Sequence, residues 1–131
     1  MTAAVHVIDA SALGALLFGE PAGEGVAERL TGARLIAPSL LPYELASICL
    51  KKLALYPARR EALLAALRLA DDMAIELVDV AAADLVELAG QSGLTAYDAA
   101  YLWLARLLDG TLVTLDHQLA TAARALGVAT A

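Results

Sequence analysis

Two aspartates follow short apolar segments that lie far apart in the chain. Asp9 ends the segment 4–9, "AVHVID", and Asp116 follows the segment 111–115, "TLVTL". Apolar runs of this length are typical of strands that are buried on both faces of a sheet. Parallel strands point their carboxyl ends to one edge, and α/β proteins bind ligands in the crevice beyond it. If the strand before Asp116 lies next to the strand before Asp9, these two carboxylates meet in that crevice.

Two further acids are expected at the same edge. Glu44 lies in the first turn of a predicted helix, in "LLPYELAS", and Asp98 lies in the first turn of another, in "LTAYDAAYLWLA". Helices that follow parallel strands begin at the edge where the strands end. Four carboxylates with few cationic neighbours would repel each other unless a cation lay between them. Oxygen ligands of this kind suit Mg²⁺ or Mn²⁺.

A structural role explains each acid taken singly. Asp9 and Asp116 are suited to cap the helices that follow them. The spacing of Thr95 and Asp98 resembles a capping box, and Glu44 in a first turn is favoured by the helix dipole. Capping and metal binding both stay open for each residue, and the gathering of four acids favours metal binding.

The acids must be positioned by alternating strands and helices. The predicted strands cover 4–9, 34–37, 74–78 and 111–115, with a possible fifth in "GVAT" at 127–130. The predicted helices cover 11–18, 23–31, 42–56, 58–71, 81–93, 96–108 and 117–126. This alternation predicts an α/β fold with a parallel sheet covered by helices on both faces.

Length and charge restrict the possible classes of protein. A chain of 131 residues suits a single domain, 1–131, with a substantial core. Its net charge of −6 argues against a non-specific nucleic-acid binder, but not against an enzyme that approaches nucleic acid through metal ions. The longest stretch without Asp, Glu, Lys or Arg has ten residues, and no basic residue precedes Arg29. We therefore expect a cytoplasmic protein without a membrane span or signal peptide.

Several other kinds of site are excluded. Cys49 is the single cysteine, expected to be buried on a helix face, and the histidines His6 and His117 lack metal-ligand spacing, so a zinc site is not expected. The chain contains no nucleophile-elbow motif and no glycine-rich phosphate loop.

Four segments, in this order, resemble the PIN-domain ribonucleases, and most closely the VapC-type toxins of toxin–antitoxin modules. The segments are "VIDASAL", "ELAS", "TAYDAAYLWLA" and "LVTLDHQLA". The third is the most specific, and the resemblance spans nearly the whole chain. It implies a PIN-like three-layer α/β/α sandwich whose parallel sheet has about five strands in the order 3-2-1-4-5.

The resemblance also implies roles for individual residues. Asp9, Glu44 and Asp98 match the three near-invariant acids of the family, and Asp116 matches the fourth, more variable one. Ser11 and Thr114 match hydroxyl residues that support the acids by hydrogen bonds. The implied activity is hydrolysis of RNA phosphodiesters with Mg²⁺ or Mn²⁺, which leaves 5′-phosphate and 3′-hydroxyl ends. Family members often carry a basic residue directly after the fourth acid, where this chain has His117.

The implied partners are RNA, a second copy of the chain and a small antitoxin protein. The local basic cluster suited to phosphate contacts consists of Lys51, Lys52, Arg59 and Arg60, although these residues also suit a solvated helix end. Tyr43 and Tyr97 each precede a proposed ligand, and suit either base stacking or the core.

Two other functions stay open. A haloacid-dehalogenase-like phosphatase also begins with an aspartate after its first strand, but needs a second acid where this chain has Ser11. A degenerate PIN domain would bind RNA or a protein without cleaving, and the presence of all four acids weighs against it.

Overall fold

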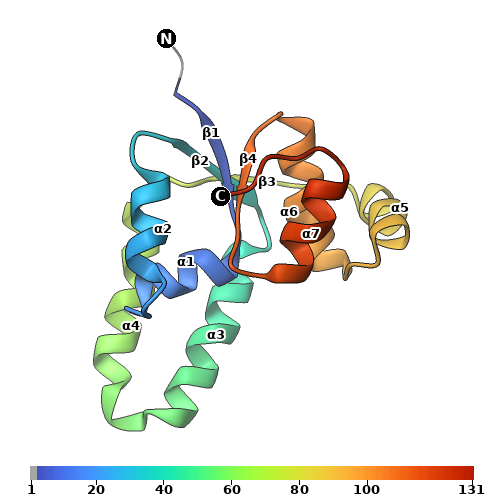
Figure 1. The fold of residues 1–131 in the computed structure, drawn as a ribbon. Helices are drawn as coiled ribbons and strands as arrows, with labels where there is room; N and C mark the ends of the chain where they lie inside the picture. The colour runs from blue at the N-terminus through green and yellow to red at the C-terminus, as the bar shows by residue number, and fades with distance from the viewer. Residues whose placement is uncertain (1–2) are drawn as a thin grey trace.

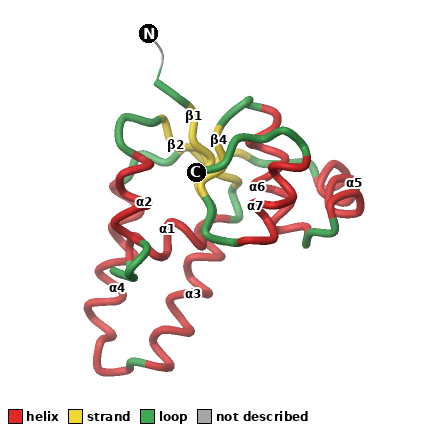
Figure 2. Tube along the Cα trace, in the orientation of Figure 1, coloured by secondary structure: helices red, strands yellow, loops and turns green. Residues whose placement is uncertain are grey.

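A computed structural model of the chain describes residues 3–131 and contains a four-stranded parallel sheet (Figures 1 and 2). The strands are β1 (Val5–Ile8), β2 (Arg34–Pro38), β3 (Glu76–Val78) and β4 (Thr111–Val113). Their order is β3-β2-β1-β4, so β1 is central and β4 is its neighbour, with Ile8 paired to Val113. Both strands therefore end side by side, as the sequence predicts.

Helices flank the sheet in two groups. The helices are α1 (Ala10–Leu17), α2 (Gly23–Leu30), α3 (Leu41–Leu55), α4 (Arg60–Arg68), α5 (Ala82–Ser92), α6 (Ala96–Leu107) and α7 (His117–Ala125). Helices α1 to α4 contact one another, and α6 contacts both α5 and α7. Right-handed connections between parallel strands place these two groups on opposite faces (Figure 1).

The core lies where α6 packs on the central strands. The side chains of Val7 and Ile8 on β1 are fully buried, as are those of Leu112 and Val113 on β4. Helix α6 contacts β1, β2 and β4, so most of its apolar segment is buried. This packing fixes the start of α6, where Asp98 lies, against the ends of the strands.

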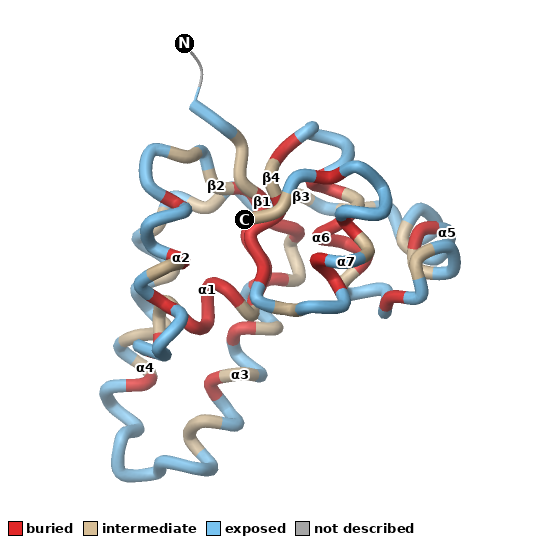
Figure 3. The backbone as a smooth tube through the Cα atoms, viewed as in Figure 1, coloured by how far each residue is buried: buried red, intermediate tan, exposed pale blue. Residues whose placement is uncertain are grey.

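The paired helices α3 and α4 form an arm that extends away from the sheet (Figure 1). The far end of the arm is exposed on all sides (Figure 3). The first part of α3, from Tyr43 to Lys51, borders the edge of the sheet where the strands end, and it carries Glu44. Cys49 is buried on α3, as predicted.

The structure differs from the sequence prediction in two elements. The expected fifth strand at 127–130 is reduced to one isolated bridge between Leu112 and Thr130, because the chain turns at Gly127, whose φ is 75°. The expected helix 58–71 is α-helical only over α4. Short 3-10 turns flank it at η1 (Pro57–Arg59) and η2 (Leu69–Asp72).

Among the described residues, no helix has the length and apolar character needed to cross a membrane.

Candidate active site

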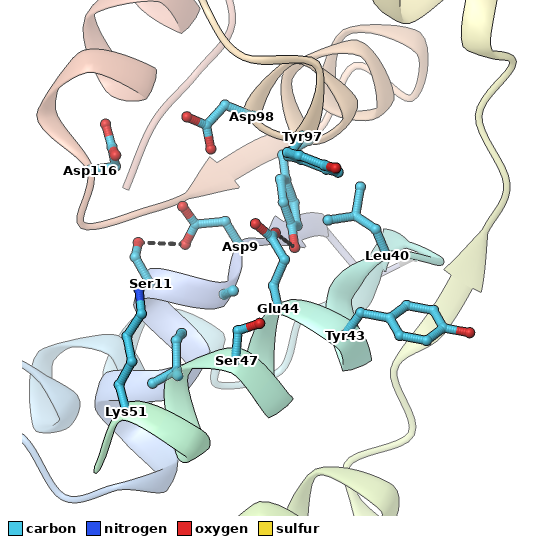
Figure 4. Close-up of a pocket in the computed structure, with 13 residues that line it drawn as sticks. Asp9, Ser11, Leu40, Tyr43, Glu44, Ser47, Lys51, Tyr97, Asp98 and Asp116 are labelled. Carbon is cyan, nitrogen blue, oxygen red and sulfur yellow. Dashed lines mark hydrogen bonds between the residues drawn. The ribbon is translucent and has the colours of Figure 1, made fainter. Parts of the chain in front are cut away.

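The four acids identified in the sequence line one pocket at the carboxyl edge of the sheet (Figure 4). The pocket has a volume of about 620 Å³. Asp9 comes from the end of β1 and Asp116 from the turn after β4, while Glu44 and Asp98 come from the first turns of α3 and α6. Residues more than 100 positions apart thus converge as the parallel topology requires.

Asp9 is the most rigidly held of the four acids. It is 4% exposed, and its carboxylate accepts three hydrogen bonds. The Ser11 hydroxyl and the Ala12 amide donate to Oδ1 at 2.7 and 2.9 Å, and the Thr114 hydroxyl donates to Oδ2 at 2.5 Å. Asp9 therefore caps α1 and also has its orientation fixed within the pocket.

The two hydroxyls connect Asp9 to the turn that carries Asp116. The amide of Leu115 donates to Ser11 Oγ, and the amide of Asp116 donates to Thr114 Oγ1, each at 3.0 Å. Since both hydroxyl oxygens already accept an N–H, their own hydrogens are free to point at the Asp9 carboxylate. Ser11 and Thr114 thus have the supporting contacts expected from the resemblance.

Replacing Thr114 by Val should test this connection. Valine keeps the shape of the side chain but leaves Asp9 Oδ2 and the Asp116 amide without their partner. Buried groups that lose a hydrogen bond cost about 1–3 kcal/mol each, so we expect a loss of stability of that order. Urea unfolding of Thr114→Val measures the loss. The control is Thr121→Val, whose exposed hydroxyl bonds only the His117 carbonyl, and equal losses in both variants would contradict the assigned role.

Glu44 is oriented by a residue that the sequence analysis did not identify as part of the site. The Tyr101 hydroxyl donates to Glu44 Oε1 at 2.7 Å. Burial, and then the adjacent Glu44, raise the pKa of Tyr101 far above its usual value, so the hydroxyl keeps its proton and acts as a donor. The spacing in the sequence could have identified Tyr101 as part of the site, because it follows Asp98 by three positions and shares its helix face.

Asp98 and Asp116 complete the site, and they lie at the capped starts of α6 and α7. Thr95 Oγ1 accepts from the Asp98 amide at 3.1 Å, and Asp116 Oδ1 accepts from the Leu119 amide at 2.9 Å. Both helices are therefore capped without using up the carboxylates. The cap of α6 uses the Thr95 hydroxyl, and the cap of α7 uses one oxygen of Asp116.

The carboxylates are held in a setting that disfavours their negative charges. Burial is the largest cause of a raised pKa for Asp9, Glu44 and Asp98. Repulsion adds to it: the charge of Asp98 raises the pKa values of Asp9 and Glu44, and the charge of Asp116 raises that of Asp98. Lys51 is the one cationic residue among those that line the pocket. The site would therefore gain from a bound cation.

Comparison with known proteins identifies the family. The model of the PIN domain matches residues 6–125. The chain belongs to the PIN-domain family. PIN domains are typically metal-dependent nucleases.

A solved structure agrees with this assignment at the level of fold. The protein PAE2754 from Pyrobaculum aerophilum matches with a TM-score of 0.75 and 24% identity, over 91% of this chain and 84% of the other. A comparison with curated proteins gives no match.

The donor set of this PIN domain fits a hydrated Mg²⁺ or Mn²⁺ ion. Within residues 3–131, no three acidic, histidine or cysteine side chains converge as a preformed metal cage. Mg²⁺ needs no such cage, because it keeps several waters and uses one or two protein carboxylates. Carboxylates that repel one another in a partly buried pocket supply the oxygens and the charge that such an ion requires.

The basic cluster expected to contact RNA is divided in this PIN domain. Lys51 lines the acidic pocket, whereas Lys52 pairs with Glu20 at 2.7 Å. Arg59 and Arg60 are exposed at the far end of the arm. Of the four, only Lys51 is placed beside the acids.

Two tyrosines at the pocket lie on the surface. Tyr43 is 78% exposed and Tyr97 is 65% exposed, and both line the pocket. The interpretation of these residues as core is therefore wrong. Both rings are therefore open to solvent at the rim of the pocket.

Proposed function

We propose that this PIN domain is an endoribonuclease that uses Mg²⁺ or Mn²⁺ to hydrolyse RNA phosphodiesters, as the toxin of a VapC-type toxin–antitoxin module. The observation that carries the proposal is the pocket in which Asp9, Glu44, Asp98 and Asp116 meet, with Asp9 fixed by two hydroxyls. Such an arrangement costs electrostatic free energy, which a structural role alone does not explain.

The four acids would hold the hydrated ion, directly or through its waters, and the other residues would order the site. A bound divalent ion lowers the pKa of a water and neutralises the charge on the phosphate. Ser11 and Thr114 keep the Asp9 oxygens oriented towards the pocket, and Tyr101 does the same for Glu44. Tyr43 and Tyr97 would stack on bases next to the cleaved bond, which would align the phosphate with the acids.

RNA cleavage with and without metal tests the proposal. We expect the purified protein to cut single-stranded RNA in Mg²⁺ or Mn²⁺ and to leave 5′-phosphate and 3′-hydroxyl ends. EDTA should stop the reaction, and added metal should restore it. Undiminished cleavage in excess chelator would point to another mechanism or a contaminating nuclease.

The two alternatives predict different results in the same assay. A degenerate PIN domain would bind RNA and leave it intact in every metal. The phosphatase alternative finds no support, because the chain belongs to a different family and has Ser11 where that chemistry needs an acid.

We also propose that a second copy of the chain and a small antitoxin cover part of the surface. Apolar side chains of the arm support this: Leu50 is 66% exposed and Leu55 is 71% exposed. Surfaces of this kind are often covered by a partner. An antitoxin arginine would pair with the carboxylates of the pocket. Light scattering of the protein alone and with its antitoxin would measure both associations.

A further inference from the structure

A second hollow lies directly beside the acidic pocket. Its volume is about 300 Å³, and it shares Asp116 with the pocket. Arg29, Thr114, His117, Arg124 and Thr130 contribute to its wall. We call it the arginine hollow, after Arg29 and Arg124. A strand that leaves the acidic pocket past Asp116 would pass over it.

The two arginines come from different parts of the fold. Arg29 lies in the last turn of α2, and Arg124 lies in the last turn of α7. A basic residue at the end of a helix is favoured by the helix dipole, which explains each arginine singly. It does not explain why two of them, 95 positions apart, line one hollow next to an active-site acid.

Both guanidinium groups are available for a ligand. Arg124 Nε donates to Thr130 Oγ1 at 3.3 Å, which leaves its other nitrogens to face solvent or a ligand. In the part of the chain that the structure describes, ion pairs join only Arg34 to Glu76 and Lys52 to Glu20. Asp116, the one acid that lines the hollow, already uses Oδ1 to cap α7.

We propose that the arginine hollow binds a backbone phosphate of the RNA strand beyond Asp116, at a distance from the phosphate that is cleaved. Guanidinium groups recognise phosphate oxygens with paired hydrogen bonds, and two of them in one hollow would hold the strand in register. The inference rests on the proposed ribonuclease function. It also explains how a chain with a net charge of −6 attracts RNA to the surface beside Asp116.

Three matched variants test the proposal: Arg29→Gln, Arg124→Gln and the control Arg106→Gln. Each arginine is the basic residue in the last turn of its helix. Each substitution therefore removes the same favourable interaction of a positive charge with the helix dipole. Arg106 lies at the end of α6 and lines neither the pocket nor the hollow. Binding of a labelled single-stranded RNA is measured by fluorescence anisotropy over a range of salt, in the Asp9→Asn background with Mg²⁺. Cleavage kinetics are measured in the otherwise unchanged protein.

We expect Arg29→Gln and Arg124→Gln each to weaken RNA binding, on the order of tenfold. Each should also reduce the slope of log affinity against log salt by about 0.7, because one phosphate contact is lost. KM should rise and kcat should stay nearly unchanged. Arg124→Lys should retain the slope, because the charge is kept. Arg106→Gln should change neither quantity.

The outcomes separate this inference from the proposed function. Equal effects of all three variants would mean a general attraction of charge and would overturn the arginine hollow. The arginine hollow would also be overturned if the parent protein cleaves RNA but Arg29→Gln and Arg124→Gln leave the slope of log affinity against log salt unchanged. If the parent protein neither binds nor cleaves RNA in Mg²⁺ or Mn²⁺, the proposed function fails together with this inference.

Discussion

We expect Asp9→Asn to lower the rate of the proposed metal-dependent RNA cleavage by about 1000-fold or more, while the protein stays folded. A neutral amide is a poor metal ligand, and several kcal/mol of transition-state stabilisation depend on the ion. Asparagine caps a helix about as well as aspartate, and its carbonyl still accepts from the Ala12 amide and Ser11. Its amide group faces the Thr114 hydroxyl, which can turn to accept a hydrogen bond. Asp116→Asn should act in the same direction, but less severely.

The matched control is Asp84→Asn, which makes the same change in the first turn of α5. Asp84 is exposed and does not line the acidic pocket. Cleavage time courses and circular dichroism of both variants decide the question. If Asp9→Asn cleaved RNA at the rate of Asp84→Asn, Asp9 would be a cap and not a ligand.

We expect Mn²⁺ to raise the melting temperature of the protein by roughly 10 °C when it is present at about 100 times its dissociation constant. Binding to the folded state alone contributes about 2.7 kcal/mol at that concentration. For a chain of this size, 1 kcal/mol corresponds to about 4 °C. Thermal melts with EDTA and with Mn²⁺ measure the shift.

The metal-free protein should become less stable as the pH rises. Asp9, Glu44 and Asp98 have raised pKa values in the folded state, whereas the unfolded chain titrates near 3.8 for Asp and 4.5 for Glu. Between the unfolded and folded pKa values, the folded protein binds more protons, so its free energy of unfolding falls with rising pH. The loss is complete above the folded pKa values. Mn²⁺ should therefore stabilise most at high pH, where the carboxylates are ionised.

Asp98→Asn provides the internal comparison for the melting experiment. The substitution removes a charge that repels Asp9 and Glu44, so the metal-free variant should melt higher than the parent protein at neutral pH. Its response to Mn²⁺ should be smaller. A shift by Mn²⁺ that is equal in Asp98→Asn and the parent protein would contradict a place for Asp98 in the metal site.

The gathering of the acids was predictable because it depends on topology and not on detail. Parallel strands must end at one edge, so Asp9 and Asp116 had to approach each other once β1 and β4 were neighbours. Glu44 and Asp98 followed from the rule that helices begin at that edge. The resemblance to PIN domains added the strand order, which the observed sheet matches over its four strands.

The remaining features depended on contacts that no local pattern encodes. Tyr101 lies in an apolar segment typical of the core, and only its partner Glu44 makes it part of the site. Arg29 and Arg124 are isolated in the sequence and meet only in the folded chain. The expected fifth strand has suitable residues, but its turn at Gly127 brings only one bridge into register with β4.

The hydrogen bond between Thr114 and Asp9 spans 105 positions of the chain, which has a consequence for synthesis on the ribosome. At about 5–20 residues per second, Thr114 is made about 5–20 s after Asp9. During that interval β1 has no neighbour on its β4 side, and the turn that orders Asp9 does not yet exist. A nascent PIN domain of this design would keep its acidic pocket incomplete, beside the RNA that encodes it, until Thr114 and Asp116 have been translated.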